Sequence, residues 1–239
     1  MRFMEKAGPK IWLLSQEWDQ TSEFLDKGAL EVSGYFALPC FSRYGGPMPS
    51  IRFLKSAVHP QDYPTEEAVE IAIAGRSNAG KSSLINLLAG SQVAKVSGTP
   101  GKTRLLNFFN VNGKYTLVDM PGYGFASRSG TEVDDWQQMV SVYLESRMNL
   151  KGLILVMDIR RPWAQEERQM KAFAEHRGVP MAVVLTKADK VTKNELNKAV
   201  SALKKASLLD SVFVVSSLKK QGHVEFEDWV FETWVKLFL

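Results

Sequence analysis

The chain has 239 residues, 45% of them hydrophobic, which is enough to bury the core of one α/β domain with an appendage. It has no apolar run near the roughly 20 residues that cross a bilayer, no signal-like apolar segment in its first 30 residues, and a single cysteine, Cys40. A membrane span, a secretory signal and an intramolecular disulfide are therefore not expected, and a cytoplasmic location is. The net charge of +4 is uneven, because residues 48–239 carry 25 basic and 20 acidic side chains; this surplus fits an RNA partner and fits an ordinary solvated surface equally well.

Residues 1–47 are predicted to form an N-terminal extension, separate from a compact domain at 48–239. They contain one helical candidate, 11–27, and lead into a glycine- and proline-rich passage, 42–49, with the composition of a linker. The extension carries no chemistry that its residues reveal. A docked appendage, a flexible appendage and a mis-assigned translation start explain it equally well.

The strongest motif lies between a predicted strand at 69–74 and a predicted helix at 83–89, after a strand-like stretch at 51–58. Its spacing, Gly-x4-Gly-Lys-Ser, suits a loop that wraps phosphates, because glycines let backbone N–H groups approach the oxygens and the following helix adds the positive end of its dipole. Lys81 can then reach the β- and γ-phosphates, and Ser82 can ligate Mg²⁺. The predicted nucleotide contacts are Gly75, Arg76, Ser77, Asn78, Ala79, Gly80, Lys81, Ser82 and Ser83.

Residues 91–104 are polar and glycine-rich, and they stand where a nucleotide hydrolase has its first mobile switch. Two predicted strands follow, at 105–111 and 115–119. Between them lies Asn112-Gly113, a dipeptide that supplies two positive φ angles and is typical of a tight hairpin.

The second of these strands ends in the motif Asp119-Met-Pro-Gly122. An aspartate at the end of a core strand can hold Mg²⁺ through a water molecule, and the N–H of Gly122 can bind the γ-phosphate. An ordinary turn has the same sequence. The position of the motif, one hairpin after the phosphate loop, favours the nucleotide interpretation.

Strands and helices then alternate, at 152–158, 164–176 and 180–185, with a helix from 193 that opens with the capping box Thr192-x-x-Glu195. This alternation predicts the α/β class and a mostly parallel six-stranded sheet with helices on both faces.

The loop Thr186-Lys-Ala-Asp189 follows the strand at 180–185, at the carboxyl end where ligands bind in such sheets. Asp189 can accept hydrogen bonds from N1–H and the amine of guanine, which adenine does not offer, and the stem of Lys187 can cover the base. A plain surface loop is the competing interpretation, and the order of the motifs favours guanine. A strand at 212–215 leads to Ser216-Ser-Leu-Lys-Lys220, whose backbone can complete the base pocket.

A final helix is predicted to place an apolar stripe on one face. We interpret the stripe as core packing rather than as a platform that stacks RNA bases. It consists of Phe226, Trp229, Val230, Thr233, Trp234 and Leu237.

Together these motifs resemble the EngB family (also called YihA or YsxC), bacterial GTPases of the Era-like group. The resemblance covers about residues 50–239 and is carried by 75–86, 99–103, 119–126, 157–162, 186–189 and 216–222. It implies a Ras-like P-loop fold, GTP and Mg²⁺ binding, and slow GTP hydrolysis to GDP and phosphate. It also implies a switch role in assembling the large ribosomal subunit, with ribosomal RNA and proteins as partners, and a link to cell division and septation. A monomer is expected, without DNA or membrane partners.

Carried over by position, the resemblance assigns Mg²⁺ to Ser82 and Thr103, and Thr103 is preferred to Thr99, which lies in the same loop. It assigns guanine to Thr186, Lys187, Ala188, Asp189, Val215, Ser216 and Ser217. Lys81, Asn78 and Thr103 are the expected catalytic residues. The expected nucleotide contacts outside the phosphate and base loops are Gly101, Lys102, Thr103, Arg104, Leu105, Asp119, Met120, Pro121 and Gly122.

The residue after Gly122 is Tyr123, whereas Ras-like enzymes place there a glutamine that orients the attacking water. Another group must then stabilise the charge on the transferring phosphoryl group. Related Era-like GTPases hold a potassium ion at the position of Asn78, so K⁺ is a candidate cofactor. A turn asparagine without this role is the alternative, and Arg76 or Arg104 acting within the chain is another.

Three functions remain open from the sequence. The first is a slow GTPase that acts as an assembly switch, the second a metabolic P-loop enzyme such as a small-molecule kinase, and the third a nucleotide-gated RNA- or protein-binding module with negligible turnover. The predicted guanine loop argues against the kinase.

Overall fold

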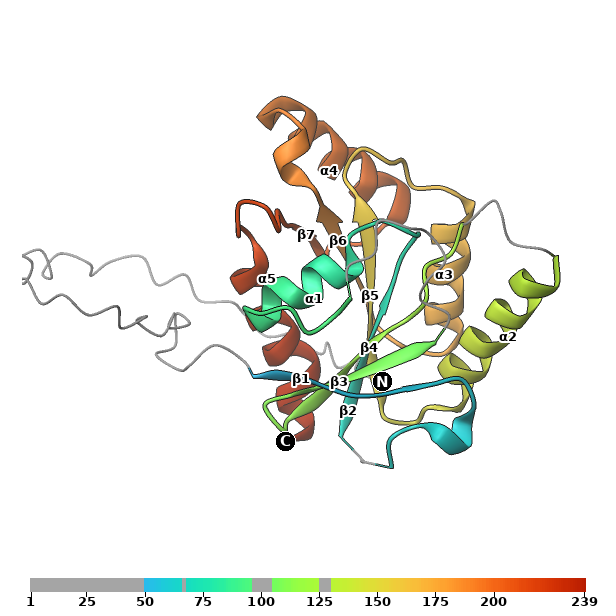
Figure 1. Ribbon diagram of the computed structural model, residues 1–239. Coiled ribbons are helices and arrows are strands. Elements are labelled where there is room, and N and C mark those ends of the chain that lie inside the picture. Colours follow the sequence, from blue (N-terminus) through green and yellow to red (C-terminus); the bar gives the residue numbers. More distant parts are fainter. Residues whose placement is uncertain (1–49, 66–67, 96–104, 125–129) are drawn as a thin grey trace, which may run out of the picture. The chain divides into compact units, whose positions relative to one another are not determined.

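The computed structural model describes residues 50–65, 68–95, 105–124 and 130–239, with the backbone alone for 130–136 (Figure 1). The predicted extension at 1–47 lies outside the described residues, and so do Gly101, Lys102, Thr103 and Arg104 of the expected switch. Predictions for these segments stay predictions.

Strands and helices alternate along most of the described chain. The strands are β1 (Ile51–Ala57), β2 (Val69–Ala74), β3 (Leu106–Val111), β4 (Tyr115–Asp119), β5 (Leu150–Asp158), β6 (Met181–Thr186) and β7 (Val212–Val214). The α-helices are α1 (Lys81–Ala89), α2 (Gly130–Ser146), α3 (Gln165–His176), α4 (Lys193–Ser207) and α5 (His223–Val230).

All seven strands form one sheet in the order β1-β3-β4-β2-β5-β6-β7. The segment from β4 to β7 is parallel, whereas β3 runs antiparallel to both β1 and β4. The predicted α/β class and mostly parallel sheet are confirmed, but the predicted count of six strands is wrong. The stretch that begins at Ile51 is a full strand, because the β3–β4 hairpin leaves the outer edge of β3 free to pair with it.

Helices cover both faces of the sheet (Figure 1). α1 and α5 pack on one face, and α2, α3 and α4 contribute buried side chains to the other. The alternation of strand side chains explains the two layers: Ile71 and Ile73 of β2 face α1 and α5, while Ala72 and Ala74 face the opposite helices. The helix α2 was not predicted from the sequence.

Two local predictions are confirmed by backbone geometry. Asn112 and Gly113 adopt φ angles of 55° and 70°, as the tight hairpin requires. The side chain of Thr192 accepts a hydrogen bond from the Glu195 N–H, and Glu195 bonds back to the Thr192 N–H, which caps α4.

The predicted stripe of the final helix is only partly correct. α5 ends at Val230 and continues as a π-helical turn, Phe231–Val235. The wider turn rotates the buried face by about one residue, so that Trp234 and Val235 are buried while Thr233 and Leu237 are exposed. Within the part of the chain that the structure describes, no helix is long and apolar enough to span a bilayer.

Candidate active site

The carboxyl ends of neighbouring parallel strands bring the predicted motifs to one edge of the sheet. The loop from Gly75 follows β2, Asp119 ends β4, Asp158 ends β5 and Thr186 ends β6. Since these four strands are adjacent in the sheet, residues separated by more than 100 positions in the sequence lie side by side. This edge is where open α/β sheets bind their ligands.

The phosphate loop is shaped by two glycines that a larger residue cannot easily replace. A Cβ on Gly75 would lie 2.3 Å from the backbone oxygen of Val156, across on β5. Gly80 has φ 104° and caps α1, and a Cβ there would approach Thr186 Oγ1 to 3.3 Å. Gly75 is therefore required by steric contact, and Gly80 chiefly by its positive φ.

Lys81 and Asp119 form the charged centre of this side of the site, and both are buried. Lys81 Nζ donates a hydrogen bond to Gly75 O at 3.0 Å. Burial lowers the pKa of Lys81, and the charge of Asp119 opposes that shift. Burial also raises the pKa of Asp119 to about 6, against the charge of Lys81. Among the described residues, Asp119 Oδ1 has no hydrogen-bond partner.

The segment after β4 lies directly on the phosphate loop. The N–H of Ser77 donates to the carbonyl of Tyr123 at 2.9 Å. A Cβ on Gly122 would lie 2.8 Å from Ser77 N and 3.0 Å from Lys81 Nζ. The geometry thus brings Asp119-Met-Pro-Gly122 to the phosphate loop, as the order of the motifs predicted.

Tyr123 turns its side chain away from this loop. Its side chain is buried in the core layer on the α2–α4 face of the sheet, and its O–H donates to Glu167 Oε1 at 2.9 Å. Burial and the neighbouring Glu167 raise the pKa of Tyr123, so the phenol stays protonated. Its hydroxyl is thus directed to the first turn of α3.

Thr186 joins the base loop to the phosphate loop. Its hydroxyl lies 2.5 Å from Ala79 O and 3.0 Å from Met157 O, so this buried side chain bonds to backbone on both neighbouring segments. The first residue of the predicted base loop therefore fixes the relative position of the two loops.

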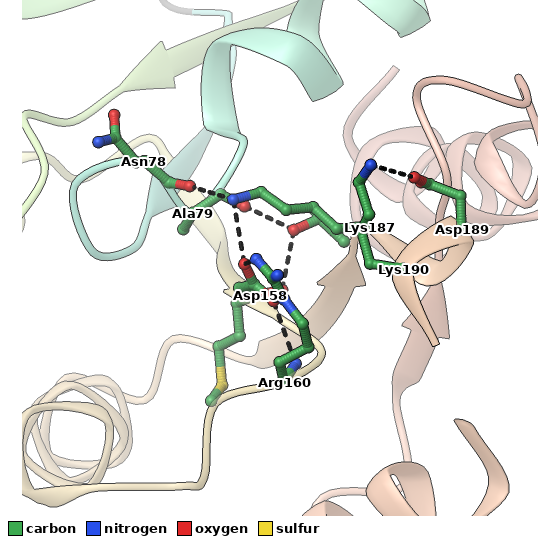
Figure 2. A network of polar contacts seen from close by, with 9 residues as sticks. Asn78, Ala79, Asp158, Arg160, Lys187, Asp189 and Lys190 are labelled. Atoms are coloured by element: carbon green, nitrogen blue, oxygen red, sulfur yellow. Dashed lines mark hydrogen bonds and ion pairs between the residues drawn. The ribbon is translucent and has the colours of Figure 1, made fainter. Parts of the chain in front are cut away.

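Lys187 makes a second connection (Figure 2). It adopts φ 59°, and its Nζ lies 2.8 Å from Asn78 O and 3.0 Å from Asp158 Oδ2. Arg160 donates hydrogen bonds to both oxygens of Asp158, with Nε 2.9 Å from Oδ1 and Nη2 2.6 Å from Oδ2. Arg160 first, and then Lys187, hold the pKa of Asp158 well below its usual range, so this carboxylate is ionised.

No role was predicted from the sequence for Asp158 or Arg160. The sequence did contain a signal for Asp158, because it ends β5 just as Thr186 ends β6, and the two residues are paired in register. The lysine was predicted only to cover a base with its stem.

Asp189 is oriented by the loop after β7. Its Oδ1 accepts a hydrogen bond from Ser216 Oγ at 2.7 Å, and this bond is the main cause of its lowered pKa. The N–H of Lys219 donates to the same hydroxyl at 3.2 Å, and Ala188 N–H donates to Val215 O at 3.4 Å. The two predicted parts of the base pocket, 186–189 and 215–217, are therefore adjacent.

Other predicted residues lie at the margins of this arrangement. Asn78 is exposed and adopts φ 62°, a conformation that asparagine tolerates in turns. Arg76 Nη1 lies 2.9 Å from Glu166 Oε1 of α3, and Leu105 is 39% exposed beside β3. Ser82 and Ser83 lie in the first turn of α1, whereas Met120 and Pro121 are buried.

This fold and site define a P-loop GTPase, and the sequence model described as "50S ribosome-binding GTPase" matches residues 70–187. The "Probable GTP-binding protein EngB" of Bdellovibrio bacteriovorus is 56% identical over 187 residues, which cover 78% of this chain and 94% of that protein. The chain belongs to the EngB family, as the resemblance of its motifs indicated.

Two solved structures agree in fold. One is a probable GTP-binding protein EngB, with a TM-score of 0.56 and 23% identity, covering 69% of this chain and 97% of that one. The other is Era in complex with MgGDPNP and a segment of 16S ribosomal RNA, with a TM-score of 0.57 and 21% identity, covering 70% of this chain and 57% of that one.

Proposed function

We propose that this GTPase hydrolyses GTP slowly and acts as a switch in the assembly of the large ribosomal subunit. The description of the matching family, 50S ribosome-binding GTPase, supports this proposal. So does the basic surplus of residues 48–239, which suits contact with ribosomal RNA. Such a role implies work in the cytoplasm and, by the family resemblance, a need for the protein in cell division and septation.

Within this proposal, residues 75–83 and 119–122 hold the phosphates, and residues 186–189 with 215–217 hold guanine. The observation that carries the assignment is the carboxylate of Asp189, fixed by Ser216 Oγ at 2.7 Å. It stands beside Lys187, whose Nζ reaches the phosphate loop at Asn78 O over 2.8 Å. A guanine bound by Asp189 is thereby held at a fixed position relative to its phosphates.

Mg²⁺ fits the chemistry of these residues. Asp119 Oδ1 is a buried carboxylate oxygen without a hydrogen-bond partner among the described residues, and Ser82 is the second residue of α1. Ser82 and Thr103 would hold the ion, with Asp119 acting through water, and the ion would neutralise charge on the β- and γ-phosphates. Lys81 supplies the second positive charge.

Thr103 is tested by substitution. Thr103→Ala is expected to lose hydrolysis and keep its GDP affinity, because GDP does not recruit the first switch. If Thr99→Ala is the inactive variant instead, the assignment of the two threonines is reversed.

The direct test of activity compares phosphate release from GTP and ATP. Release from GTP alone supports the proposal, and release from ATP at an equal rate contradicts the role of Asp189. Co-sedimentation with isolated ribosomal subunits, in the presence of GDP and of a non-hydrolysable GTP analogue, tests the switch. Retention on the large subunit that does not depend on the nucleotide would contradict it.

A binding module with negligible turnover is the second candidate. One observation favours it: Tyr123, which stands where Ras-like enzymes place a water-orienting glutamine, directs its O–H to Glu167. The two candidates separate in a single-turnover measurement with large subunits present, where the switch accelerates hydrolysis and the module does not.

A further inference from the structure

The first turn of α3 contacts both segments that border the phosphates. Glu166 Oε1 accepts a hydrogen bond from Arg76 Nη1 at 2.9 Å, and Glu167 Oε1 accepts one from the Tyr123 O–H at 2.9 Å. Two adjacent glutamates thus hold the second residue of the phosphate loop and the residue after Gly122. We call these four side chains the α3 clamp.

The Glu167 half of the clamp is rigid. Glu167 is 1% exposed, and its second oxygen accepts the backbone N–H of Ala164 at 3.0 Å. A buried carboxylate with both oxygens bonded has no low-energy rotation, because any turn leaves a donor unpaired. Tyr123 remains a donor, since its raised pKa keeps the phenol protonated.

The clamp acts on Gly122 through backbone. The carbonyl of Tyr123 accepts from Ser77 N–H at 2.9 Å, and residues 76 and 123 form a parallel bridge. A Cβ on Gly124 would lie 2.9 Å from the guanidinium carbon of Arg76. Tyr123 is therefore bonded to the phosphate loop through its backbone and to α3 through its side chain. Because Gly122 is the preceding residue, a shift of Tyr123 moves Gly122 relative to Lys81.

We propose that Tyr123 and Glu167 are positioning residues for GTP hydrolysis. They fix the distance between the N–H of Gly122 and Nζ of Lys81, and with it the alignment of both groups on the terminal phosphate. This inference rests on the proposed contact of Gly122 with that phosphate. Tyr123 therefore contributes through the backbone that it anchors, in place of a side chain that orients water.

A purely structural role is the competing explanation, because α3 also packs on the sheet through Ala174, with Met170 and Phe173 partly buried beside it. The two explanations differ in what they leave unchanged. A positioning role lowers the hydrolysis rate at saturating GTP and spares GDP affinity, because GDP lacks the phosphate that Gly122 would contact. A structural role lowers stability and affinity for both nucleotides together.

The experiment uses the full chain with Tyr123→Phe, which removes only the O–H and keeps the ring in its packing. We expect the single-turnover rate at saturating GTP to fall by roughly tenfold or more, the range that misplacement of a reacting group costs. GDP affinity should stay within about twofold of the parent, since the base contacts are untouched. Glu175→Gln is the matched control, because it removes a carboxylate of the same helix that pairs with Lys171 and, among the described residues, has no side-chain hydrogen bond to the phosphate loop or to Tyr123.

A double variant, Tyr123→Phe with Glu167→Gln, separates rate from stability. Tyr123→Phe alone leaves a buried carboxylate oxygen unpaired and lowers the melting temperature. Neutralising Glu167 should recover part of that loss while the rate stays low, because the link to Gly122 is still cut. A rate that recovers together with the melting temperature would show a structural role.

The proposal is overturned if Tyr123→Phe hydrolyses GTP at the parental rate, or if its GDP affinity falls in step with its rate. If the proposed function itself is wrong, a different measurement shows it: the parent chain releases phosphate from ATP as fast as from GTP. Because the Tyr123 comparison concerns the rate at saturating GTP, the two failures are distinguishable.

Discussion

The base side of the site, 186–189 with 215–217, and its phosphate side, 75–83 with 119–122, are built by different means. On the base side, Thr186, Lys187 and Asp189 each make a side-chain hydrogen bond of 2.5 to 2.8 Å to another loop. On the phosphate side, Gly75 and Gly122 lie where a Cβ would stand less than 3 Å from neighbouring backbone. The base side is thus held together by side-chain hydrogen bonds, whereas the backbone of the phosphate side packs so closely that Gly75 and Gly122 have no room for a Cβ.

This difference predicts two kinds of mutational response. Substitutions on the base side exchange one hydrogen-bonding group for another, and they should change which ligand binds while the fold persists. Substitutions that add a Cβ on the phosphate side displace backbone and should damage binding and stability together. The predictions below test that division, from the largest expected effect to the smallest.

Gly75→Ala should cause the largest loss. Its Cβ would lie 2.3 Å from the oxygen of Val156, a backbone atom of a central strand. We expect destabilisation of about 3 kcal/mol or more, with loss of GDP binding. Gly113→Ala is the control, since it has φ 70° and no atom within 4 Å of the added Cβ; it should cost only about 1 kcal/mol. Chemical unfolding measures both, and equal losses would break the comparison.

Asp189→Asn should change specificity without unfolding the chain. Asparagine can still accept the bond from Ser216, but it loses the charge-assisted pair with guanine, so GTP affinity should fall about a hundredfold. Xanthosine nucleotides, which present complementary groups, should bind better than GTP. Titration with both nucleotides decides the matter, and unchanged GTP affinity would remove Asp189 from base recognition.

Asp119→Asn tests the phosphate side through pH. The pKa of Asp119 is raised to about 6 from 3.8, so the folded state binds this proton more tightly than the unfolded state does. The ionised Asp119 therefore lowers the parent's free energy of unfolding above pH 6, and this loss disappears as the pH falls toward 3.8 and the carboxyl group is protonated in both states. The nucleotide-free variant should be more stable than the parent at pH 8, by about 1 to 3 kcal/mol. Urea unfolding at pH 8 and pH 4 tests this, and a difference independent of pH contradicts it.

Asp158→Asn should weaken the connection between the two sides. Without the charge, Lys187 loses its ion pair and holds Asn78 O less firmly. We expect GDP release to accelerate by about tenfold, equal to about 1.4 kcal/mol. Glu232→Gln, which removes an exposed pair with Lys236, is the control for loss of a carboxylate. A stopped-flow measurement in which both variants release GDP alike would show that the connection contributes nothing.

The potassium proposal gives the smallest effect. Because Asn78 has φ 62°, alanine would add backbone strain, and Asn78→Gly is the cleaner substitution. Hydrolysis by the parent should rise several-fold when K⁺ replaces Na⁺ at constant ionic strength, and the glycine variant should lose that difference with GTP affinity nearly intact. Equal parental rates in the two salts would leave Asn78 as a turn residue only.

The motifs of the candidate site were recognisable in the sequence because each depends on short-range spacing. The phosphate loop, the Asp119 motif and the base loop each lie within eight residues, so their spacing is readable from letters alone. Their adjacency followed from one rule, that parallel strands bring their carboxyl ends to the same edge. The Asn112-Gly113 hairpin and the α4 capping box were predictable for the same local reason.

What the sequence left unpredicted depends on tertiary packing. Asp158 acquires its role only because β5 lies beside β6, and Arg160 reaches back over two residues to bond it. The π-helical turn at Phe231–Val235 moves the buried face of the last helix, a change that no 3.6-residue pattern contains. The direction of the Tyr123 side chain depends on Glu167, which lies 44 residues further along the chain.

The two outer strands of the sheet bear on how copies of this protein behave at high concentration. β1 carries a bulge between Phe53 and Lys55, with exposed Arg52 and Lys55 beside it, and β7 at the opposite edge is only three residues long. A bent and charged edge, or a very short one, offers poor hydrogen-bonding registry to a strand from another molecule. The described domain is thus protected at both margins against edge-to-edge aggregation, even though Phe53 and Leu54 expose apolar surface there.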